Sequence, residues 1–336
     1  MAFVFSNMIT HKTRFSMKNL LIITFTMLLA CQSAQRYSGN PVITHMYTAD
    51  PSAHVFNDTL YVYPSHDSDT ATWFNMEDWH VFSTTDMVNW TDHGVALSLD
   101  DISWAKKNAW APDCEYFNGK YYFYYPTDQN YIGVAIGDKP WGPFEDPLGE
   151  PLITRETPGV VNNRDLIDPS VFIDDDNTPY LYFGQNFVCM VKLNNDMISF
   201  DDTVTVIEGA DHFFEAVWVH KYNDKYYLSY SGRGQILYGM SDSPYGPFEY
   251  KGVILDKVNS GTNHHSIVQY KGQWYLFYHN SDLFFRNHPE EEGKFGWQDD
   301  GVHPYRRSIC VDSLFYNEDG TIQQVIPSEK GVEMIQ

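Results

Sequence analysis

Three carboxylates stand at the start of apolar, strand-like segments of this sequence. Asp50 and Asp168 each open an Asp-Pro-Ser triplet that leads into a Val-Phe pair, and Glu215 lies within Phe-Phe-Glu-Ala-Val-Trp. One Asp-Pro-Ser triplet is most often a turn or cap, but burying a carboxylate is costly unless it has a partner or a function. Two triplets in comparable positions, together with an acid among large apolar residues, favour acid–base chemistry.

An internal repeat shows which elements must position these groups. Five segments share a turn followed by an aromatic strand, and they align on Tyr61, Tyr122, Tyr180, Tyr227 and Tyr275. The turns contain Asn-Gly, Asn-Asp or Lys-Gly, which are typical of β-hairpins. A period of roughly 50 residues with about four strands per unit is typical of propeller blades. The sequence therefore predicts an all-β, five-bladed β-propeller.

The same alignment predicts where the titratable groups meet. Counting back 11 or 12 residues from the aligned tyrosines reaches Asp50, Asp168, Glu215 and His264, whereas the second unit has Ala111. The innermost strand of each propeller blade faces the axis. Four of the five equivalent positions should therefore bring a titratable group to one central point.

Three carboxylates at one point are typical of glycoside hydrolysis. That reaction uses one carboxylic acid to protonate the leaving oxygen and a second carboxylate opposite it as base or nucleophile. A third carboxylate would raise the pKa of the acid by repulsion between like charges. The composition, with 24 Tyr and 9 Trp, also supplies flat aromatic faces that suit sugar rings.

Four other residues are candidates for the same site. Trp73 and Trp110 are predicted to form the wall of the pocket. Arg307 either belongs to a surface basic pair or binds substrate hydroxyls and steadies the acid. His264 is either an ordinary satisfied histidine or a ligand of a central calcium ion, although calcium prefers oxygen ligands.

Composition restricts the class of protein. The 336 residues are 43% hydrophobic, enough for a sizeable core, and one domain is expected over residues 40–330. A net charge of −22 repels phosphate backbones, so nucleic acid is not an expected partner, whereas neutral glycans are compatible with it. Cys114, Cys189 and Cys310 have no metal-site spacing and are expected to be buried free thiols.

The N-terminus resembles an export signal over residues 1–31. Met17 and Lys18 precede an apolar run that ends in Leu-Leu-Ala-Cys, with Cys31 as its last residue, and Met17 is a possible true start. This ending resembles a bacterial lipobox, in which the cysteine is lipidated; the alternative is an ordinary secretory signal. We expect an exported protein, a lipoprotein at the periplasm or cell surface or else secreted, whose only membrane contact is a lipid anchor on Cys31.

Five short motifs together resemble glycoside hydrolase family 43, a family of inverting five-bladed propeller enzymes. The motifs occupy residues 48–52, 167–170, 214–221, 263–267 and 307–308. The resemblance implies that Asp50 is the general base, Glu215 the general acid and Asp168 the residue that tunes the pKa of the acid. It also implies that His264 lies near a central cation and that Arg307 contacts substrate.

Two further motifs, and some differences from the family's sequence pattern, indicate which branch of the family this chain resembles. Residues 63–67 and 110–113 resemble the arabinofuranosidase and xylosidase branches of the family. Many relatives have the pattern Glu-Ala-Pro-Trp-Met-His, where this chain has Val217 in place of the Pro and Val219 in place of the Met. Both replacements are apolar, and Glu215 is retained. The Trp-Met-Asn-Asp-Pro-Asn opening of related retaining families is missing, which argues against a fructan-cleaving enzyme.

We therefore expect a monomeric, inverting exo-glycosidase that acts on plant cell-wall oligosaccharide or polysaccharide. The favoured activity is that of an α-L-arabinofuranosidase removing arabinose from arabinan or arabinoxylan. A β-xylosidase is the alternative within the same family, and a non-catalytic, surface-anchored glycan-binding propeller is the alternative from another class.

Overall fold

The computed structural model describes residues 36–161, 164–291 and 305–335. From Tyr37 onward these residues belong to one compact unit. The predicted export signal, with Met17 and Cys31, lies outside the described residues, so the signal and the lipid anchor stay predictions. Among the helices of the described ranges, none has the length and apolar character needed to span a membrane.

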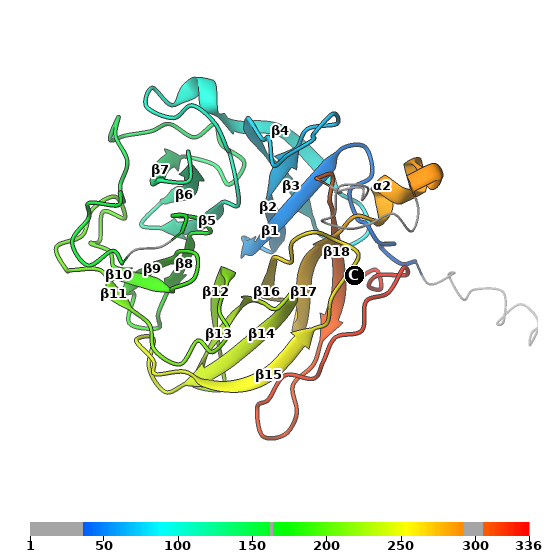
Figure 1. The fold of residues 1–336 in the computed structure, drawn as a ribbon. Coiled ribbons are helices and arrows are strands. Elements are labelled where there is room, and N and C mark those ends of the chain that lie inside the picture. Colours follow the sequence, from blue (N-terminus) through cyan, green and yellow to red (C-terminus); the bar gives the residue numbers. More distant parts are fainter. Residues whose placement is uncertain (1–35, 162–163, 292–304, 336) are drawn as a thin grey trace, which may run out of the picture. The chain divides into compact units, whose positions relative to one another are not determined.

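In these described ranges, eighteen strands form five antiparallel sheets that surround a common centre (Figure 1). Blade 1 contains β1 (Tyr47–Phe56), β2 (Thr59–Asp67), β3 (Asp78–Thr84) and β4 (Thr91–Ser98). Blade 2 contains β5 (Asp113–Phe117), β6 (Lys120–Thr127) and β7 (Tyr131–Gly137). Blade 3 contains β8 (Ser170–Ile173), β9 (Pro179–Phe183), β10 (Cys189–Lys192) and β11 (Thr205–Val206). Blade 4 contains β12 (Glu215–Tyr222), β13 (Lys225–Gly232), β14 (Gln235–Ser241) and β15 (Glu249–Leu255).

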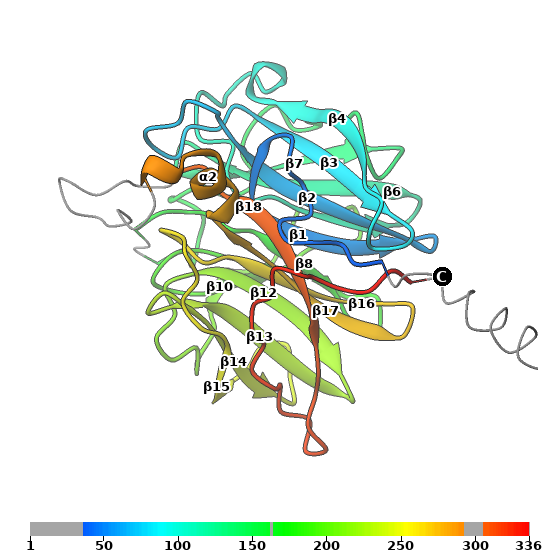
Figure 2. The same cartoon turned by 90° about the vertical axis from the view of Figure 1, so that its right-hand side faces the viewer.

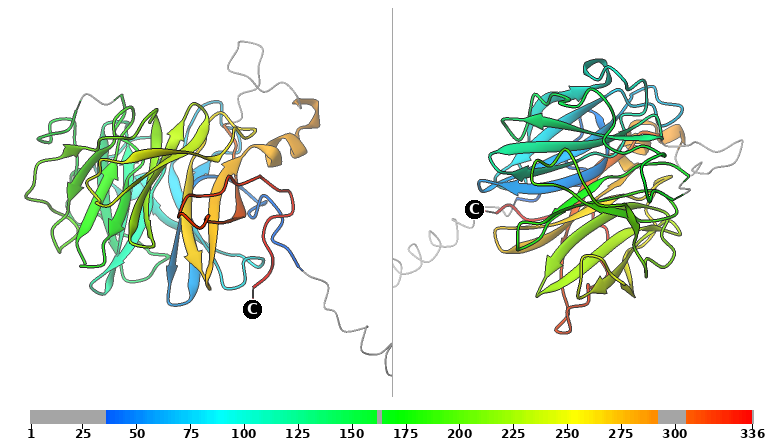
Figure 3. Two further views of the ribbon diagram at one scale, coloured as in Figure 1. Left: turned by 90° about the horizontal axis from the view of Figure 1, so that it is seen from below. Right: turned by 90° about the vertical axis from the view of Figure 1, so that its left-hand side faces the viewer.

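Blade 5 contains β16 (His265–Tyr270), β17 (Gln273–Asn280) and β18 (Ser308–Leu314). The helical segments are short: η1 (Leu99–Asp101) follows blade 1, while α2 (Asp282–Asn287) and η2 (Pro289–Glu291) follow β17. Figures 2 and 3 show the ring of sheets from the side, with α2 at its edge.

The first strand of each blade lines the centre of the ring. These strands contact one another in the order β1, β5, β8, β12 and β16, and β16 contacts β1 again. The chain before and at the start of β1 also contacts the start of β18 and the residue before it. The backbone N–H of Val42 donates to the carbonyl of Ile309 at 2.8 Å, and that of Thr48 donates to the carbonyl of Arg307 at 2.9 Å. The predicted five-bladed propeller is confirmed.

The aligned tyrosines all lie on the second strand of their blades, as the repeat predicts. Tyr61 pairs with His54 of β1, and Tyr227 pairs with His220 of β12. The turns before them need left-handed backbone; Asn57, for example, has a φ of 49°. Asn tolerates this conformation better than most residues do, which explains why these turns are hairpin signals.

Among the described residues, three blades have the expected four strands. Blade 2 and blade 5 have three strands each. In blade 2, isolated bridges from Ile132 to Ile153 and from Ile136 to Glu145 take the place of a fourth strand. Residues 140–151 of that segment include four prolines, which lack the N–H that a regular ladder needs.

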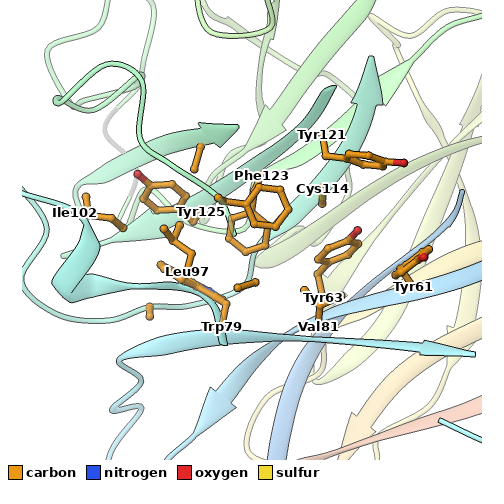
Figure 4. Close-up of a cluster of buried hydrophobic side chains, with 14 of the residues drawn as sticks. Tyr61, Tyr63, Trp79, Val81, Leu97, Ile102, Cys114, Tyr121, Phe123 and Tyr125 are labelled. Carbon is orange, nitrogen blue, oxygen red and sulfur yellow. The ribbon is translucent and has the colours of Figure 1, made fainter. Parts of the chain in front are cut away.

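A cluster of buried aromatic side chains packs blade 1 against blade 2 (Figure 4). Phe123 lies at its centre, with ring centroids 5.7 Å from Trp79, 6.1 Å from Tyr63 and 4.9 Å from Phe144. Phe123 and Trp79 are fully buried. Cys114 belongs to the same cluster, and the expected free, buried state of Cys114, Cys189 and Cys310 is confirmed.

This packing predicts a large cost for truncating Phe123. The change Phe123→Ala should lower the free energy of unfolding by about 3–5 kcal/mol, since it removes a fully buried ring and leaves a cavity. The control is Phe315→Ala, because Phe315 is 53% exposed, and it should change stability by no more than about 0.5 kcal/mol. Urea unfolding measures both, and equal effects of the two variants would contradict the assigned core.

Candidate active site

One cavity of about 390 Å³ opens at the axis, a volume within the usual range for small-molecule sites. All seven residues selected from the sequence line it: Asp50, Trp73, Trp110, Asp168, Glu215, His264 and Arg307. Ala111, the second unit's equivalent position, also lines it. The structure thus brings every predicted site residue to one place, although their roles in catalysis stay predictions.

Irregular backbone at the heads of the inner strands turns the carboxylates toward the cavity. Asp50 and Asp168 have positive φ angles of 51° and 55°, and Ala216, next to Glu215, has a φ of 61°. The pairing of β1 and of β12 shifts register at these points. Such bulges redirect side chains at the ends of strands, and Asp adopts left-handed backbone more readily than most residues.

Asp50 lies in a strongly cationic environment. The Arg307 guanidinium donates a hydrogen bond to its Oδ1 at 2.8 Å, and the Ser65 hydroxyl donates to its Oδ2 at 2.7 Å. Burial by itself would raise the pKa of Asp50, but the charge of Arg307 and the contact with the His264 imidazole hold it well below its usual range. Asp50 is therefore a carboxylate at neutral pH.

Glu215 lies in an environment that favours the protonated carboxyl group, in contrast to that of Asp50. Burial raises its pKa to about 8, and the negative charge of Asp168 adds to that rise. The Gln185 side chain donates from Nε2 to Glu215 Oε2 at 2.7 Å and so orients the carboxyl group. Glu215 is therefore mainly a carboxylic acid at pH 7. Both causes favoured by the sequence act, the apolar surroundings of Glu215 and the repulsion between like charges, and burial is the larger one.

Asp168 sits beside Glu215 and is fixed through the backbone. Its Oδ2 accepts a hydrogen bond from the N–H of Ala216 at 2.7 Å, immediately after Glu215 in the chain. Burial raises the pKa of Asp168 to about 6. Asp168 therefore both holds the backbone that carries Glu215 and disfavours ionisation of Glu215.

Arg307 is held more tightly than the sequence suggested. Its Nε and Nη2 donate to the two carboxylate oxygens of Asp67 at 2.9 and 2.8 Å, and its Nη1 donates to Asp50 and to Thr262. Arg307 is 2% exposed, which excludes the alternative of a surface basic pair. The hydrogen bonds of Arg307 stabilise the ionised state of Asp50 and do not reach Glu215.

His264 lies beside the same carboxylate. Its Nδ1 is 3.5 Å from Asp50 Oδ1, and its side chain is largely buried. His279, which the sequence did not select, accepts the N–H of Asp50 on its Nδ1 at 3.1 Å. Burial lowers the pKa of His279 to about 3, so this imidazole is neutral and can act as the acceptor.

The cavity wall is aromatic on the side of Trp73 and Trp110. The indole N–H of Trp110 donates to the carbonyl of Phe74 at 2.9 Å, and Phe74 packs edge-on against Trp110 with centroids 6.4 Å apart. The Arg307 guanidinium lies 5.2 Å from the Phe74 ring centroid. Trp73 is 47% exposed, so its ring is accessible at the cavity mouth.

Sequence reasoning missed Asp67, Gln185, His279 and Phe74. Asp67 lies within the motif of residues 63–67, but its partner Arg307 is 240 residues away in the chain. No local sequence pattern therefore predicts the ion pair between them. Gln185 had a weak signal, because it is a polar residue two positions after the end of the buried strand β9. Neither His279 nor Phe74 belongs to a motif.

A five-bladed propeller with carboxyl groups of opposed protonation in one axial cavity has the architecture of a glycoside hydrolase. The model of the family "Glycosyl hydrolases family 43" matches residues 38–322, and the chain belongs to this family. It is therefore a glycoside hydrolase, rather than a propeller that only binds glycans.

Three similar proteins illustrate the family. Xylosidase/arabinosidase 43A of Humicola insolens is 39% identical, over 84% of this chain and 98% of its own. A family 43 β-xylosidase/α-arabinofuranosidase from a compost microbial metagenome, solved with xylotriose in a calcium-free form, is 40% identical with a TM-score of 0.73, covering 87% and 98% of the two chains. An α-L-arabinofuranosidase of Clostridium thermocellum is 43% identical with a TM-score of 0.71 and the same coverage.

The site predicts that Asp168 controls the protonation of Glu215. In Asp168→Asn, an amide oxygen can still accept the Ala216 N–H, but the negative charge is gone, so the pKa of Glu215 should fall below about 8. Carbon-13 NMR of glutamate labelled at its side-chain carboxyl group, with Glu215→Gln to assign the signal, measures the titration. An unchanged pKa would show that burial alone sets the protonation of Glu215.

Proposed function

We propose that this enzyme is an inverting exo-glycosidase in which Asp50 is the general base, Glu215 the general acid and Asp168 the residue that tunes and orients Glu215. One observation carries this proposal: two carboxyl groups in one cavity are held in opposite protonation states, Asp50 ionised by Arg307 and Glu215 protonated by burial. Acid–base catalysis near neutral pH requires such a pair.

The proposed reaction balances in one displacement. Glu215 gives its proton to the glycosidic oxygen as the bond to the anomeric carbon breaks. Asp50 takes a proton from the water that attacks the opposite face of the sugar. Inverting enzymes place the two carboxyl groups roughly 6.5–9.5 Å apart to leave room for this water. A proton exchange with solvent then restores both groups.

For the substrate, we favour terminal α-L-arabinofuranosyl groups of arabinan or arabinoxylan. The name of the Clostridium thermocellum relative supports this choice, and the aromatic wall of Trp73 and Trp110 suits a sugar ring. The second candidate is a β-xylosidase activity, which the compost relative supports through its name and its bound xylotriose. The two sugars are pentoses of similar outline, so one pocket can accept both.

A calcium ion near His264 is a second part of the proposal. The compost relative was solved in a calcium-free form, which is consistent with calcium binding in the family. His264 offers a nitrogen, whereas calcium takes mainly oxygen ligands, and Asp50 is already bound by Arg307 and Ser65. The residues therefore fit an ion that keeps most of its water ligands. Such an ion would supply positive charge at the axis.

The first test compares substrates and follows the product anomer. We expect a higher kcat/KM for an aryl α-L-arabinofuranoside than for an aryl β-D-xyloside, and release of arabinose from arabinan or arabinoxylan. Proton NMR during hydrolysis of the arabinofuranoside should show β-arabinose first, because the configuration inverts. A preference for the xyloside would select the second candidate, and an α-anomer formed first would exclude inversion.

The second test removes the acid. Glu215→Gln should lower kcat about 10²–10⁴-fold on a glycoside with a poor leaving group and much less on an aryl glycoside with a good one, since a good leaving group needs little protonation. In the wild type, kcat/KM should fall as the pH rises through about 8, where Glu215 of the free enzyme loses its proton, and this limb should vanish in the variant.

The matched control for the second test is Glu318→Gln, which changes an exposed glutamate in the turn after β18 and should keep the wild-type profile. Near-full activity of Glu215→Gln on the poor leaving group would overturn the assignment of the acid.

A further inference from the structure

A second cluster of polar side chains lies on blade 1, outside the axial cavity. His66 of β2 and Asp78 and His80 of β3 bring one ligand atom each to within 4.8 Å of one another. Asp78 Oδ1 lies 2.7 Å from His66 Nδ1 and 3.8 Å from His80 Nε2. Tetrahedral zinc with bonds of about 2.0–2.1 Å places its ligand atoms roughly 3.4 Å apart, so small side-chain movements would bring these atoms to that spacing.

The surroundings of His80 fix which nitrogen can bind a metal. His80 Nδ1 lies 3.3 Å from Asp92 Oδ1, and Asp92 also accepts a hydrogen bond from the N–H of Gly94 at 2.7 Å. A carboxylate that accepts the Nδ1 proton leaves Nε2 with a free lone pair, here on the side of Asp78. Metal-binding histidines commonly have this arrangement, in which a second carboxylate orients the ring.

The cluster lies where the backbone pairing of its two strands ends. β2 and β3 pair from Leu60–Thr84 to Val62–Phe82. Continuing this antiparallel register would place His66 opposite Asp78 and Pro64 opposite His80. Pro64 has no N–H to extend the ladder, so side chains alone connect the strands at this end.

We propose that His66, Asp78 and His80 form a binding site for a divalent transition-metal ion, with zinc as the best-fitting ion, that clamps the end of β2 to β3. Two imidazoles and one carboxylate suit zinc better than calcium or magnesium, which prefer oxygen ligands. The three side chains are 14–25% exposed, so an ion can reach them and keep water as a fourth ligand.

This site is distinct from the proposed calcium position at His264. His66 lies on β2 between Ser65 and Asp67. Ser65 donates a hydrogen bond to Asp50, and Asp67 accepts hydrogen bonds from Arg307, both at the axial cavity. Because successive side chains of a strand point to opposite faces, His66 points away from those groups. Metal bound at this site would therefore steady the strand that carries Ser65 and Asp67 without touching the reacting groups.

The test is a zinc titration of the full chain after chelator treatment, with a chromogenic zinc chelator as competitor and thermal unfolding as a second measurement. We expect one equivalent of bound zinc and a rise in Tm with zinc concentration. In His80→Gln and in His66→Gln this equivalent and the Tm rise should be lost. The Asp92 side chain orients His80 without binding the metal itself, so Asp92→Asn should weaken zinc binding about 10–100-fold.

Two controls make the outcome specific. His93→Gln changes a histidine of β4 that bonds the Ser83 hydroxyl, and it should keep the bound zinc. His264→Ala should keep it as well, since His264 belongs to the axial cavity. Zinc binding that survives His80→Gln, or that is lost in His264→Ala, would overturn the proposal, as would a wild-type protein that binds no zinc. If His66→Gln does not fold, His80→Gln and Asp92→Asn decide.

Discussion

The buried guanidinium of Arg307 is the interaction on which both the ring and the site depend. It is 2% exposed and is shared by two buried carboxylates, Asp50 and Asp67. A buried charge is tolerated only when it is paired and its hydrogen-bonding groups are satisfied, and loss of one partner from such a set is strongly destabilising. The three residues are therefore one unit, and each requires the other two.

This unit connects the two ends of the propeller. Asp50 and Asp67 belong to β1 and β2 of the first blade, while Arg307 directly precedes β18 of the last blade. The Arg307 carbonyl accepts the N–H of Thr48, so the backbone of the same residue also joins these blades. Closing the ring and ionising Asp50 are consequences of the same contact. A propeller opened at this seam would lose the low pKa of Asp50 as well as a blade interface.

The sequence predicted the positions of the site residues better than their partners. The five-fold repeat located Asp50, Asp168, Glu215 and His264, because each stands 11 or 12 residues before an aligned tyrosine and every inner strand faces the axis. The partner of Arg307 was not predictable in the same way, since it depends on ring closure between residues far apart in the chain. The apolar neighbours of Glu215 in the sequence favoured a raised pKa, but the larger effect of burial over charge repulsion was not predictable, because the hydration of a carboxyl group depends on all of its neighbours. In blade 2, the lack of a regular fourth strand among the described residues reflects local chemistry, and the prolines of residues 140–151 could have indicated it.

The strand β2 shows how one segment can serve two purposes at once. Because successive side chains of a strand point to opposite faces, Ser65 and Asp67 contact Asp50 and Arg307, whereas His66 contacts Asp78 on the neighbouring strand β3. The backbone of Ser65, His66 and Asp67 stays paired with β1, whereas the pairing of β2 with β3 ends before Pro64, so side-chain contacts connect these residues to β3. The hydrogen bonds to Asp50 and Arg307 restrain one face of the strand, and the His66–Asp78 contact restrains the other. The strand that holds Asp50 and Arg307 on its cavity face is thus also restrained on its opposite face, outside the cavity.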